Sequence, residues 1–286
     1  MGTSTILWLF MAAFGASALG GVLGMASGIF IVPILTLVFG VDIHVAIGAS
    51  IVSVIACSCG SAASFLKERL TNIRLAIVLE TSTTLGALTG VLLIGIISTA
   101  FLYGLFAIIL AVSAQQMLAR RREVVYAEPG NVRSWATVLR LHSSFPDRTL
   151  GRDVSYRVRR VPLGLSLMYG AGLISALLGI GSGVLKIPAM DTALRLPIKV
   201  SSATSNFMIG VTAAASGGAY FMRGDINVGI AGPVALGSVL GALIGARLLM
   251  RLPADKLRIF FVIVLALLAI QMFLIALGVH ISGGPA

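Results

Sequence analysis

Lys186 is the residue whose type and position in this sequence point most clearly to chemistry. It stands three residues after Gly183, within an apolar run over residues 163–195. If this run crosses a bilayer, burying the lysine costs at least about 2.5 kcal/mol, so the residue needs an ionic partner or a charged substrate. We expect Lys186 to offer positive charge to an anion or to pair with Asp191. The alternative is an ammonium group that extends to the membrane interface.

Two glycine-rich breaks interrupt long apolar runs, one over residues 24–28 and one over residues 179–183. A helix that begins at Gly28 or Gly183 would direct backbone N–H groups and a partial positive charge towards a bound anion. Irregular backbone inside a bilayer is tolerated where it is buried in protein or lines a cavity. We therefore interpret the breaks as broken helices near the membrane midplane that form an anion site. The alternative is that these glycines only allow helices to pack closely.

Hydroxyl and amide side chains complete the candidate site. In the run that follows each break they recur at spacings of three and four residues, which places them on one face of a helix. Such groups donate hydrogen bonds to anion oxygens without adding a fixed charge. Hydrogen bonding between helices is the alternative role for each of them. The candidate substrate-binding residues are Ser27, Gly28, Ser50, Ser182, Gly183, Lys186, Ser205, Asn206 and Thr212.

Glu80 is a second charged residue within an apolar segment, about six residues beyond Arg74. An intramembrane carboxylate can carry a coupling proton, whereas a carboxylate near the end of a span can simply be interfacial, and both interpretations are open for Glu80. The three histidines fall in loops or near a terminus, and we find no Ser/His/Asp set, phosphate-binding loop or metal-binding cluster. The sequence therefore predicts no enzyme activity, no cofactor and no metal site.

The composition indicates which kind of protein must position these groups. Of the 286 residues, 58% are hydrophobic and 11% are charged, and the mean hydropathy is +1.03. A soluble domain has about 25% charged residues, so a water-soluble globule is excluded. Several apolar runs exceed the roughly 20 residues that cross a bilayer as a helix. The sequence predicts an all-α, polytopic membrane protein with apolar runs at about 4–39, 45–66, 74–96, 101–119, 163–195, 200–222, 229–250 and 257–278.

The segment between the fourth and fifth apolar runs differs from the rest of the chain. Residues 119–161 contain ten arginines and four acidic residues. Short basic loops stay on the cytoplasmic side, so the net charge of +11 indicates orientation in a membrane rather than nucleic-acid binding. Trp135, Val138 and Leu139 share one helical face, which suits an interfacial helix on anionic headgroups; a solvated loop is the alternative. We divide the chain into a first transmembrane repeat (1–118), a basic cytoplasmic loop (119–162) and a second transmembrane repeat (163–286).

An internal repeat relates the two transmembrane parts. A shift of 155 residues aligns residues 18–118 with residues 173–273 without a gap and keeps glycine, proline, serine and asparagine residues in phase. The run over residues 4–39 would form a helix of about 54 Å, which exceeds the roughly 30 Å of a bilayer core, so it must break. Each repeat then has about five segments, and an odd number inverts one repeat relative to the other. This arrangement keeps most cations of the second half cytoplasmic and places both termini outside; eight spans with parallel repeats are the alternative.

The motifs resemble those of the TauE/SafE sulfite exporter family, and the resemblance covers about 200 residues in both halves. In the first half it rests on Gly24-Met-Ala-Ser-Gly28, Pro33 and Ala46-Ile-Gly-Ala-Ser50. In the second half it rests on Gly179-Ile-Gly-Ser-Gly183, on Lys186-Ile-Pro-Ala-Met190 and on the segment from Ala203 to Thr212. The usual break of the family is Gly-x-Gly-Gly-Gly, and this chain departs from it at Ala26, Ser27 and Ser182.

The resemblance implies a multi-pass protein of a bacterial or archaeal cytoplasmic membrane that exports sulfite or a related organosulfur anion. Secondary transport by alternating access between two inverted repeats agrees with this function. The expected partners are a small sulfur-containing anion and the lipid bilayer, with no nucleic acid, and a homodimer is left open. Two alternatives remain, namely a transporter of another small solute and a non-transporting membrane module that recruits a partner through its basic loop.

Overall fold

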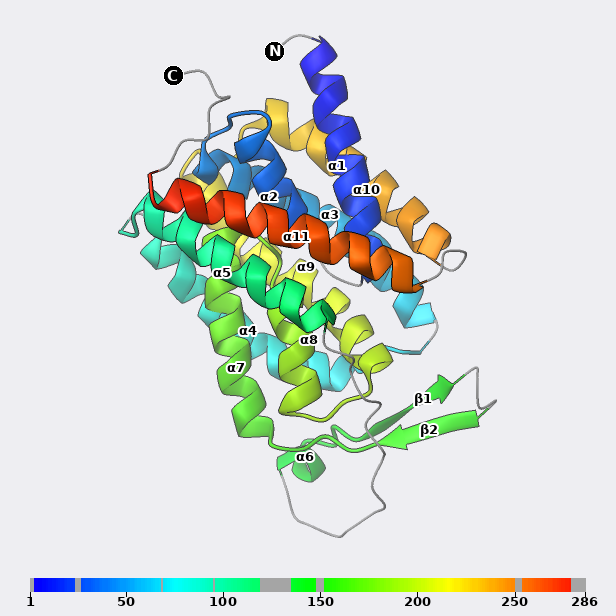
Figure 1. The fold of residues 1–286 in the computed structure, drawn as a ribbon. Coiled ribbons are helices and arrows are strands. Elements are labelled where there is room, and N and C mark those ends of the chain that lie inside the picture. The colour runs from blue at the N-terminus through cyan, green and yellow to red at the C-terminus, as the bar shows by residue number, and fades with distance from the viewer. Residues whose placement is uncertain are drawn as a thin grey trace.

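The computed structural model describes residues 3–23, 27–67, 69–94, 96–118, 135–147, 152–249 and 254–278, and helices dominate it (Figure 1). The first part of the chain forms α1 (Thr3–Leu23), α2 (Gly28–Leu37), α3 (Ile43–Lys67), α4 (Ile73–Leu93) and α5 (Thr99–Leu118). The second forms α7 (Val161–Leu178), α8 (Gly183–Thr192), α9 (Ile198–Met222), α10 (Val228–Leu249) and α11 (Ala254–Ala276). Between them lie α6 (Trp135–Val138), β1 (Ser143–Asp147) and β2 (Arg152–Tyr156).

Both predicted breaks are present. In the first, α1 ends at Leu23 and α2 begins at Gly28, with residues 24–26 outside the described part. In the second, Gly179 and Gly181 have φ angles of +63° and +70°, which glycine adopts without the steric cost of a side chain. Ser182 also has a positive φ, of +37°, and this is a strained conformation for a residue with a Cβ. The second break is therefore a sharp left-handed turn that ends α7 and starts α8 in a new direction.

The long helices pack in pairs at short distances. Helix α1 lies along α10, and α4 lies along α7. Gly86 of α4 faces the carbonyl of Tyr169 in α7, and Gly241 of α10 faces the carbonyl of Phe14 in α1, with no room for a side chain at either glycine. Helix α3 packs against α9, and α5 runs beside α11 on one side of the bundle (Figure 1). Small residues thus allow close backbone contact, as is typical of helices in a membrane.

The central loop folds onto one end of the bundle. Strands β1 and β2 pair in antiparallel fashion, with Ser143 opposite Tyr156. The buried Leu141, Phe145 and Tyr156 form one apolar cluster with Leu75 and Leu79 of α4. Asn72, the N-cap of α4, donates 2.9 Å hydrogen bonds both to the Leu141 carbonyl and to the Tyr156 hydroxyl. The expectation of an all-α chain is wrong in this region, because the loop contains a β-hairpin.

Within the described residues, the predicted interfacial helix corresponds to the single turn of α6. Trp135 and Val138 are 65% and 77% exposed, so the apolar face expected from the sequence is present at the surface. Its neighbour Ala136 is buried against the bundle. The basic residues 119–134 lie outside the described part of the chain. The loop is therefore a docked cap with one exposed apolar edge.

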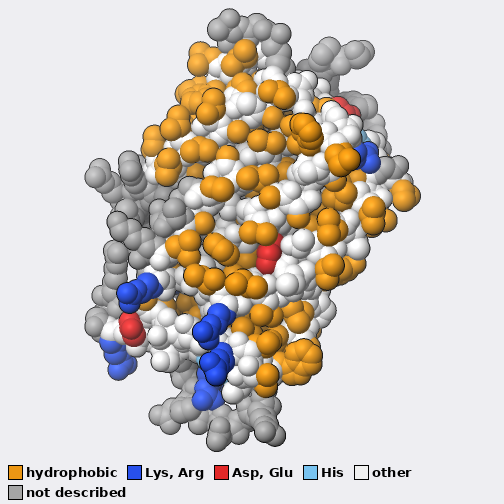
Figure 2. Space-filling model, turned by 180° about the vertical axis from the view of Figure 1, so that it is seen from behind, with side chains coloured by type: hydrophobic (Ala, Val, Ile, Leu, Met, Phe, Trp, Pro, Cys, Tyr) orange, Lys and Arg blue, Asp and Glu red, His pale blue; other side chains and the backbone are white. Residues whose placement is uncertain are grey.

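Three helices in the described residues are long and apolar enough to cross a membrane: α4, residues Thr99–Gln116 of α5, and α7. Shorter apolar stretches occur in α1, α2, α3, α10 and α11. Hydrophobic side chains are spread widely over the face shown in Figure 2, while the visible Lys and Arg side chains gather mainly towards one end. This distribution is that of a surface in contact with lipid rather than water.

Candidate substrate site

Lys186 is completely buried, with an exposed fraction of 0%. Its ammonium Nζ lies 3.3 Å from Glu80 Oε2 and donates a 2.6 Å hydrogen bond to Thr212 Oγ1. The interpretation that Lys186 extends to the membrane interface is therefore wrong, because its charge is held inside the protein. Its ionic partner is Glu80 rather than Asp191, the partner expected from the sequence. Helices α4, α8 and α9 thus converge on one buried ion pair.

Glu80 is accordingly an internal group rather than an interfacial one. The residue is 8% exposed, and its carboxylate accepts hydrogen bonds from Thr212 Oγ1 and, at 3.3 Å, from Thr84 Oγ1. Thr212 therefore contacts both charges, since it accepts from Lys186 and donates to Glu80. A buried ion pair is tolerated only when its remaining polar atoms are satisfied in this way.

The start of α8 positions Lys186. The carbonyl of Ser182 accepts the backbone N–H groups of Leu185 and Lys186 at 2.9 and 2.8 Å, which fixes the first turn of the helix. Side chains in a helix lean towards its N-terminus, so the lysine stem extends back along this turn. Residues 179–183 supply the sharp turn that starts the helix in the interior of the bundle.

Three buried hydroxyl groups, one at the start of α8 and two in the first turns of α9, have no hydrogen-bond partner among the described residues. They belong to Ser182, Ser201 and Ser205, each 0% exposed. A buried hydroxyl without a partner costs about 1–3 kcal/mol, so these groups are candidates to bind a ligand. Ser205 and Thr212 are seven residues apart on α9, which places them on one face about 10 Å apart along the axis. The hydroxyls therefore extend from the ion pair towards the start of α9.

The predicted site residues of the first half are engaged elsewhere. Ser27 Oγ lies 3.2 Å from Ser53 Oγ, and Ser53 Oγ donates to Ser238 Oγ of α10. Ser50 Oγ donates a 2.8 Å hydrogen bond to the carbonyl of Gly179. Gly28 packs against the same carbonyl. These residues join the two halves of the chain, and the hydrogen bonds of Ser27 and Ser50 go to Ser53 and Gly179 rather than to Lys186.

Asn206 and Gly183 also form hydrogen bonds within the protein. The side-chain amide of Asn206 donates to the Ser202 carbonyl at 3.1 Å, and its backbone carbonyl accepts from Ser58 Oγ at 2.6 Å. Gly183 is the first residue of α8, and its N–H donates to the Gly181 carbonyl. Of the predicted set, Lys186 and Thr212 are brought together. Gly183 and Ser205 lie on the same two helices, and Ser182 is the residue directly before α8. Asn206 serves helix contacts.

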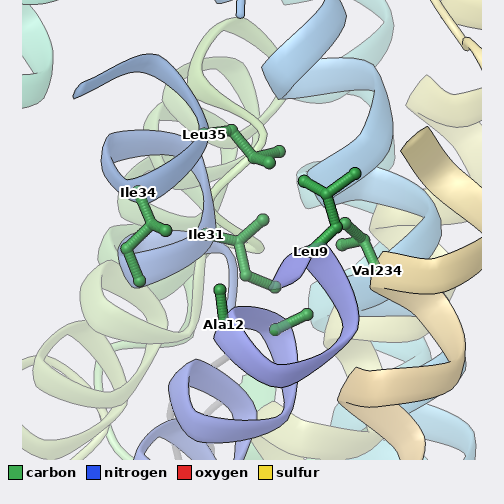
Figure 3. A pocket seen from close by; sticks show the side chains of 7 residues that line it. Leu9, Ala12, Ile31, Ile34, Leu35 and Val234 are labelled. Carbon is green, nitrogen blue, oxygen red and sulfur yellow. The ribbon is translucent and has the colours of Figure 1, made fainter. Parts of the chain in front are cut away.

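The position equivalent to Lys186 in the first half lines an apolar recess. The shift of 155 residues places Ile31 on Lys186. Ile31 lines a small, partly open recess together with Leu9, Ala12, Ala13, Ile34, Leu35 and Val234 (Figure 3). All seven lining residues are apolar, so this recess cannot stabilise a charge. The two halves are chemically different at their equivalent points.

Sequence reasoning missed three features of the site. The pairing of Glu80 with Lys186 joins residues 106 positions apart. A signal existed, because buried charges in a membrane pair with one another by default. Thr84 was missed although it follows Glu80 by one helical turn, where side chains of a helix meet. The contact between Ser53 and Ser238 had no sequence signal, because nothing in the spacing relates these two serines.

Comparison with known proteins agrees with this architecture. The family model described as "Sulfite exporter TauE/SafE" matches residues 9–272. The chain belongs to this family. It is 24% identical over 267 residues to "Probable membrane transporter protein YunE" of Bacillus subtilis (strain 168), covering 90% of this chain and 93% of that protein. It is 26% identical over 238 residues to "Probable membrane transporter protein YdhB" of the same strain, covering 83% and 88%. No solved structure matches the chain significantly.

Membership of the TauE/SafE family resolves part of the expected function. The family and the names of both relatives support membrane transport, which agrees with the apolar helices of the structure. The chain is therefore a multi-pass membrane protein of a transporter family rather than of an enzyme family.

Proposed function

We propose that this protein is a secondary transporter that exports sulfite or a related small organosulfur anion across the cytoplasmic membrane by alternating access. The observation that carries the proposal is the fully buried Lys186 in the first turn of a broken helix. A lysine in this position is costly unless it serves a charged ligand or partner. The family description names sulfite, which supplies the class of anion.

The helix contacts support two repeats as the moving parts. The shift of 155 residues maps α1 on α7 and α4 on α10, so the pair α1/α10 is the counterpart of the pair α7/α4. The same shift maps the contact of Gly86 with Tyr169 on that of Gly241 with Phe14. Reciprocal contacts of this kind are expected when two repeats are related by a two-fold axis.

The ends of the helices support inversion of these repeats. Helix α4 begins at the central loop, where Asn72 bonds to Leu141. Its counterpart α10 begins after Arg223, whose guanidinium donates to the Ile94 carbonyl at the far end of α4. Figure 1 likewise shows α1 beginning at the end of the bundle opposite to the loop from which α7 begins. Equivalent helices of opposite direction favour ten segments in inverted repeats over eight spans in parallel repeats. We retain the division into residues 1–118, 119–162 and 163–286.

The chemistry around Lys186 suits a small oxyanion. The ammonium supplies the charge, and the hydroxyls of Thr212 and of Ser182, at the start of α8, can donate to oxygen atoms. The hydroxyl of Ser205, about 10 Å from Thr212 along α9, would contact the anion at another point of its path. The left-handed turn over residues 179–183 adds backbone N–H groups of the kind that cradle anions. Lys186 is closed to solvent in this conformation, which is therefore interpreted as an occluded state between the two open states of the cycle.

Flux of labelled bisulfite through proteoliposomes tests this function. Lys186→Met alone would leave Glu80 buried without its partner, so the double variant Lys186→Met/Glu80→Gln, which keeps the site neutral, is the better test. We expect it to lose flux while a control, Lys199→Met at an exposed lysine of α9, retains it. Retained flux in the double variant would contradict this placement of the site. If deletion within the loop abolished function while the site variants had no effect, recruitment of a partner through the loop would replace transport as the function.

A further inference from the structure

We propose that Glu80 and Lys186 make this transporter carry one proton together with each monovalent anion. This inference rests on the proposed function and specifies its coupling. The inference is based on the net charge of the buried site. The site contains one carboxylate and one ammonium group, and both contact the same threonine hydroxyl.

The pair is neutral as it stands. The side chain of Lys186 is 0% exposed and that of Glu80 is 11% exposed, so neither charge is stabilised appreciably by water. Each is stabilised by the other and by Thr212. Loss of one member of such a pair is strongly unfavourable, because an uncompensated charge then remains in a medium that solvates it poorly.

The other charged side chains on the neighbouring helices do not replace either member of the pair. Glu80 lies on α4, which packs against α7 and α9, and Lys186 lies on α8. The titratable or charged side chains described on these four helices are Arg74, Glu80, Tyr169, Lys186, Asp191, Lys199 and Tyr220. Arg74 and Lys199 are exposed near the first residues of α4 and α9, and Tyr169 is 39% exposed. Asp191 lies more than one helical turn beyond Lys186 on α8, and the Tyr220 hydroxyl donates to the Ala176 carbonyl.

Binding of an anion changes the net charge of the buried site. If bisulfite joined Lys186 while Glu80 remained ionised, the buried site would hold one net negative charge. If a proton from the water on the same side reaches Glu80 as the anion arrives, the protonated carboxyl group, the ammonium and the intact monovalent anion sum to zero. Lys186 then exchanges its carboxylate partner for the anion, and Thr212 retains a hydrogen-bond partner in both states. Release on the other side reverses both steps, so one proton and one anion leave together.

This coupling has a consequence for energetics. Both the empty and the loaded site are neutral, so the membrane potential does no work on the cycle. The direction of flux follows the product of the anion and proton gradients. Export then proceeds when the internal anion concentration is high enough to exceed the opposing inward proton gradient.

The experiment measures bisulfite flux in proteoliposomes under imposed potassium diffusion potentials. The buffer is mildly acidic on both sides of the membrane, so that bisulfite predominates over sulfite. For the wild type we expect the ratio of internal to external bisulfite to be independent of the membrane potential. One proton should cross the membrane with each anion, as measured by a pH dye in the lumen. Glu80→Gln mimics the protonated carboxyl group and frees Lys186 permanently. Its flux should carry charge, so the accumulation ratio should change about tenfold for about 60 mV. Asp225→Asn, in the turn before α10 where the half-buried carboxylate pairs with Arg223 outside the site, is the matched control and should behave as the wild type.

The outcomes separate this inference from the proposed function. Wild-type bisulfite flux that follows the potential without proton movement would overturn the coupling and leave the transport function intact. Absence of wild-type flux above that of protein-free vesicles would overturn both. If Glu80→Gln fails to fold, as judged by gel filtration, the wild-type dependence on potential and proton count still decides the question.

Discussion

Gly28 of the first break lies directly against the carbonyl oxygen of Gly179 in the second break. A Cβ built on Gly28 would lie 2.5 Å from this oxygen and 2.7 Å from Ser50 Oγ, which itself donates to the same carbonyl. The two broken helices, taken from opposite halves of the chain, therefore meet at one backbone contact. This contact can transmit movement between the halves during a transport cycle.

The first prediction concerns Gly28→Ala. The added methyl group cannot be accommodated against backbone atoms, so the breaks must separate, and we expect a loss of thermal stability corresponding to about 1–3 kcal/mol. Unfolding in detergent, followed by fluorescence, measures the change. Gly170→Ala is the control, because a Cβ there meets nothing within 4 Å and alanine is the better helix former. Equal stability of the two variants would contradict the close contact.

The second prediction concerns the charges of the site. Lys186→Met leaves Glu80 buried without its ammonium partner, and we expect it to destabilise the protein by about 3–5 kcal/mol. Adding Glu80→Gln should restore much of the loss, because the site becomes neutral again. A double-mutant cycle on thermal unfolding measures this coupling. Additive effects of the two substitutions would show that the residues do not interact.

The third prediction concerns Asn72, which anchors the central loop. Asn72→Asp keeps the side-chain oxygen that accepts the Leu75 N–H and caps α4, but it removes the two donors to Leu141 and Tyr156. We therefore expect the loop to undock while α4 remains intact. Faster trypsin cleavage after the loop arginines, with unchanged helix content by circular dichroism, is the measurement. Asn227→Asp, at the corresponding cap of α10, is the control and should leave the loop docked.

Much of the helical fold was predictable from the sequence, since glycine and apolar run length determine where the helices begin and end. The breaks at Gly28 and Gly183 are examples. The β-hairpin was not predictable in the same way, because Pro146 and the polar residues of β1 and β2 give no alternating pattern. Its stability comes from apolar side chains such as Phe145 that pack on α4, a contact between distant segments.

The candidate site was predictable only in part. Lys186 and Thr212 were identified because polar groups inside apolar runs are costly. Ser50 was assigned to the substrate by the same reasoning, and spacing alone does not show that its hydroxyl faces a carbonyl of the other half. The internal repeat does not predict the ion pair, since the counterparts of Lys186 and Glu80 are Ile31 and Ala235.

The last prediction concerns the pH dependence of loop docking. Partial burial and the nearby Arg157 guanidinium hold the pKa of His142 below its ordinary value, and its Nδ1 accepts the Val158 N–H at 3.2 Å. Protonation of Nδ1 would remove this hydrogen bond. The undocked loop binds the proton more readily than the docked one, so docking is most stable above about pH 6.5 and weakens as the pH falls below that value.

Hydrogen–deuterium exchange of the β1 and β2 amides, corrected for intrinsic rates, measures this effect between about pH 7.5 and about pH 5.5. We expect protection to decrease at the lower pH. In His142→Asn the amide oxygen can still accept the Val158 N–H but cannot titrate, so its protection should not change over this range. An equal loss of protection in wild type and His142→Asn would show that another group controls docking.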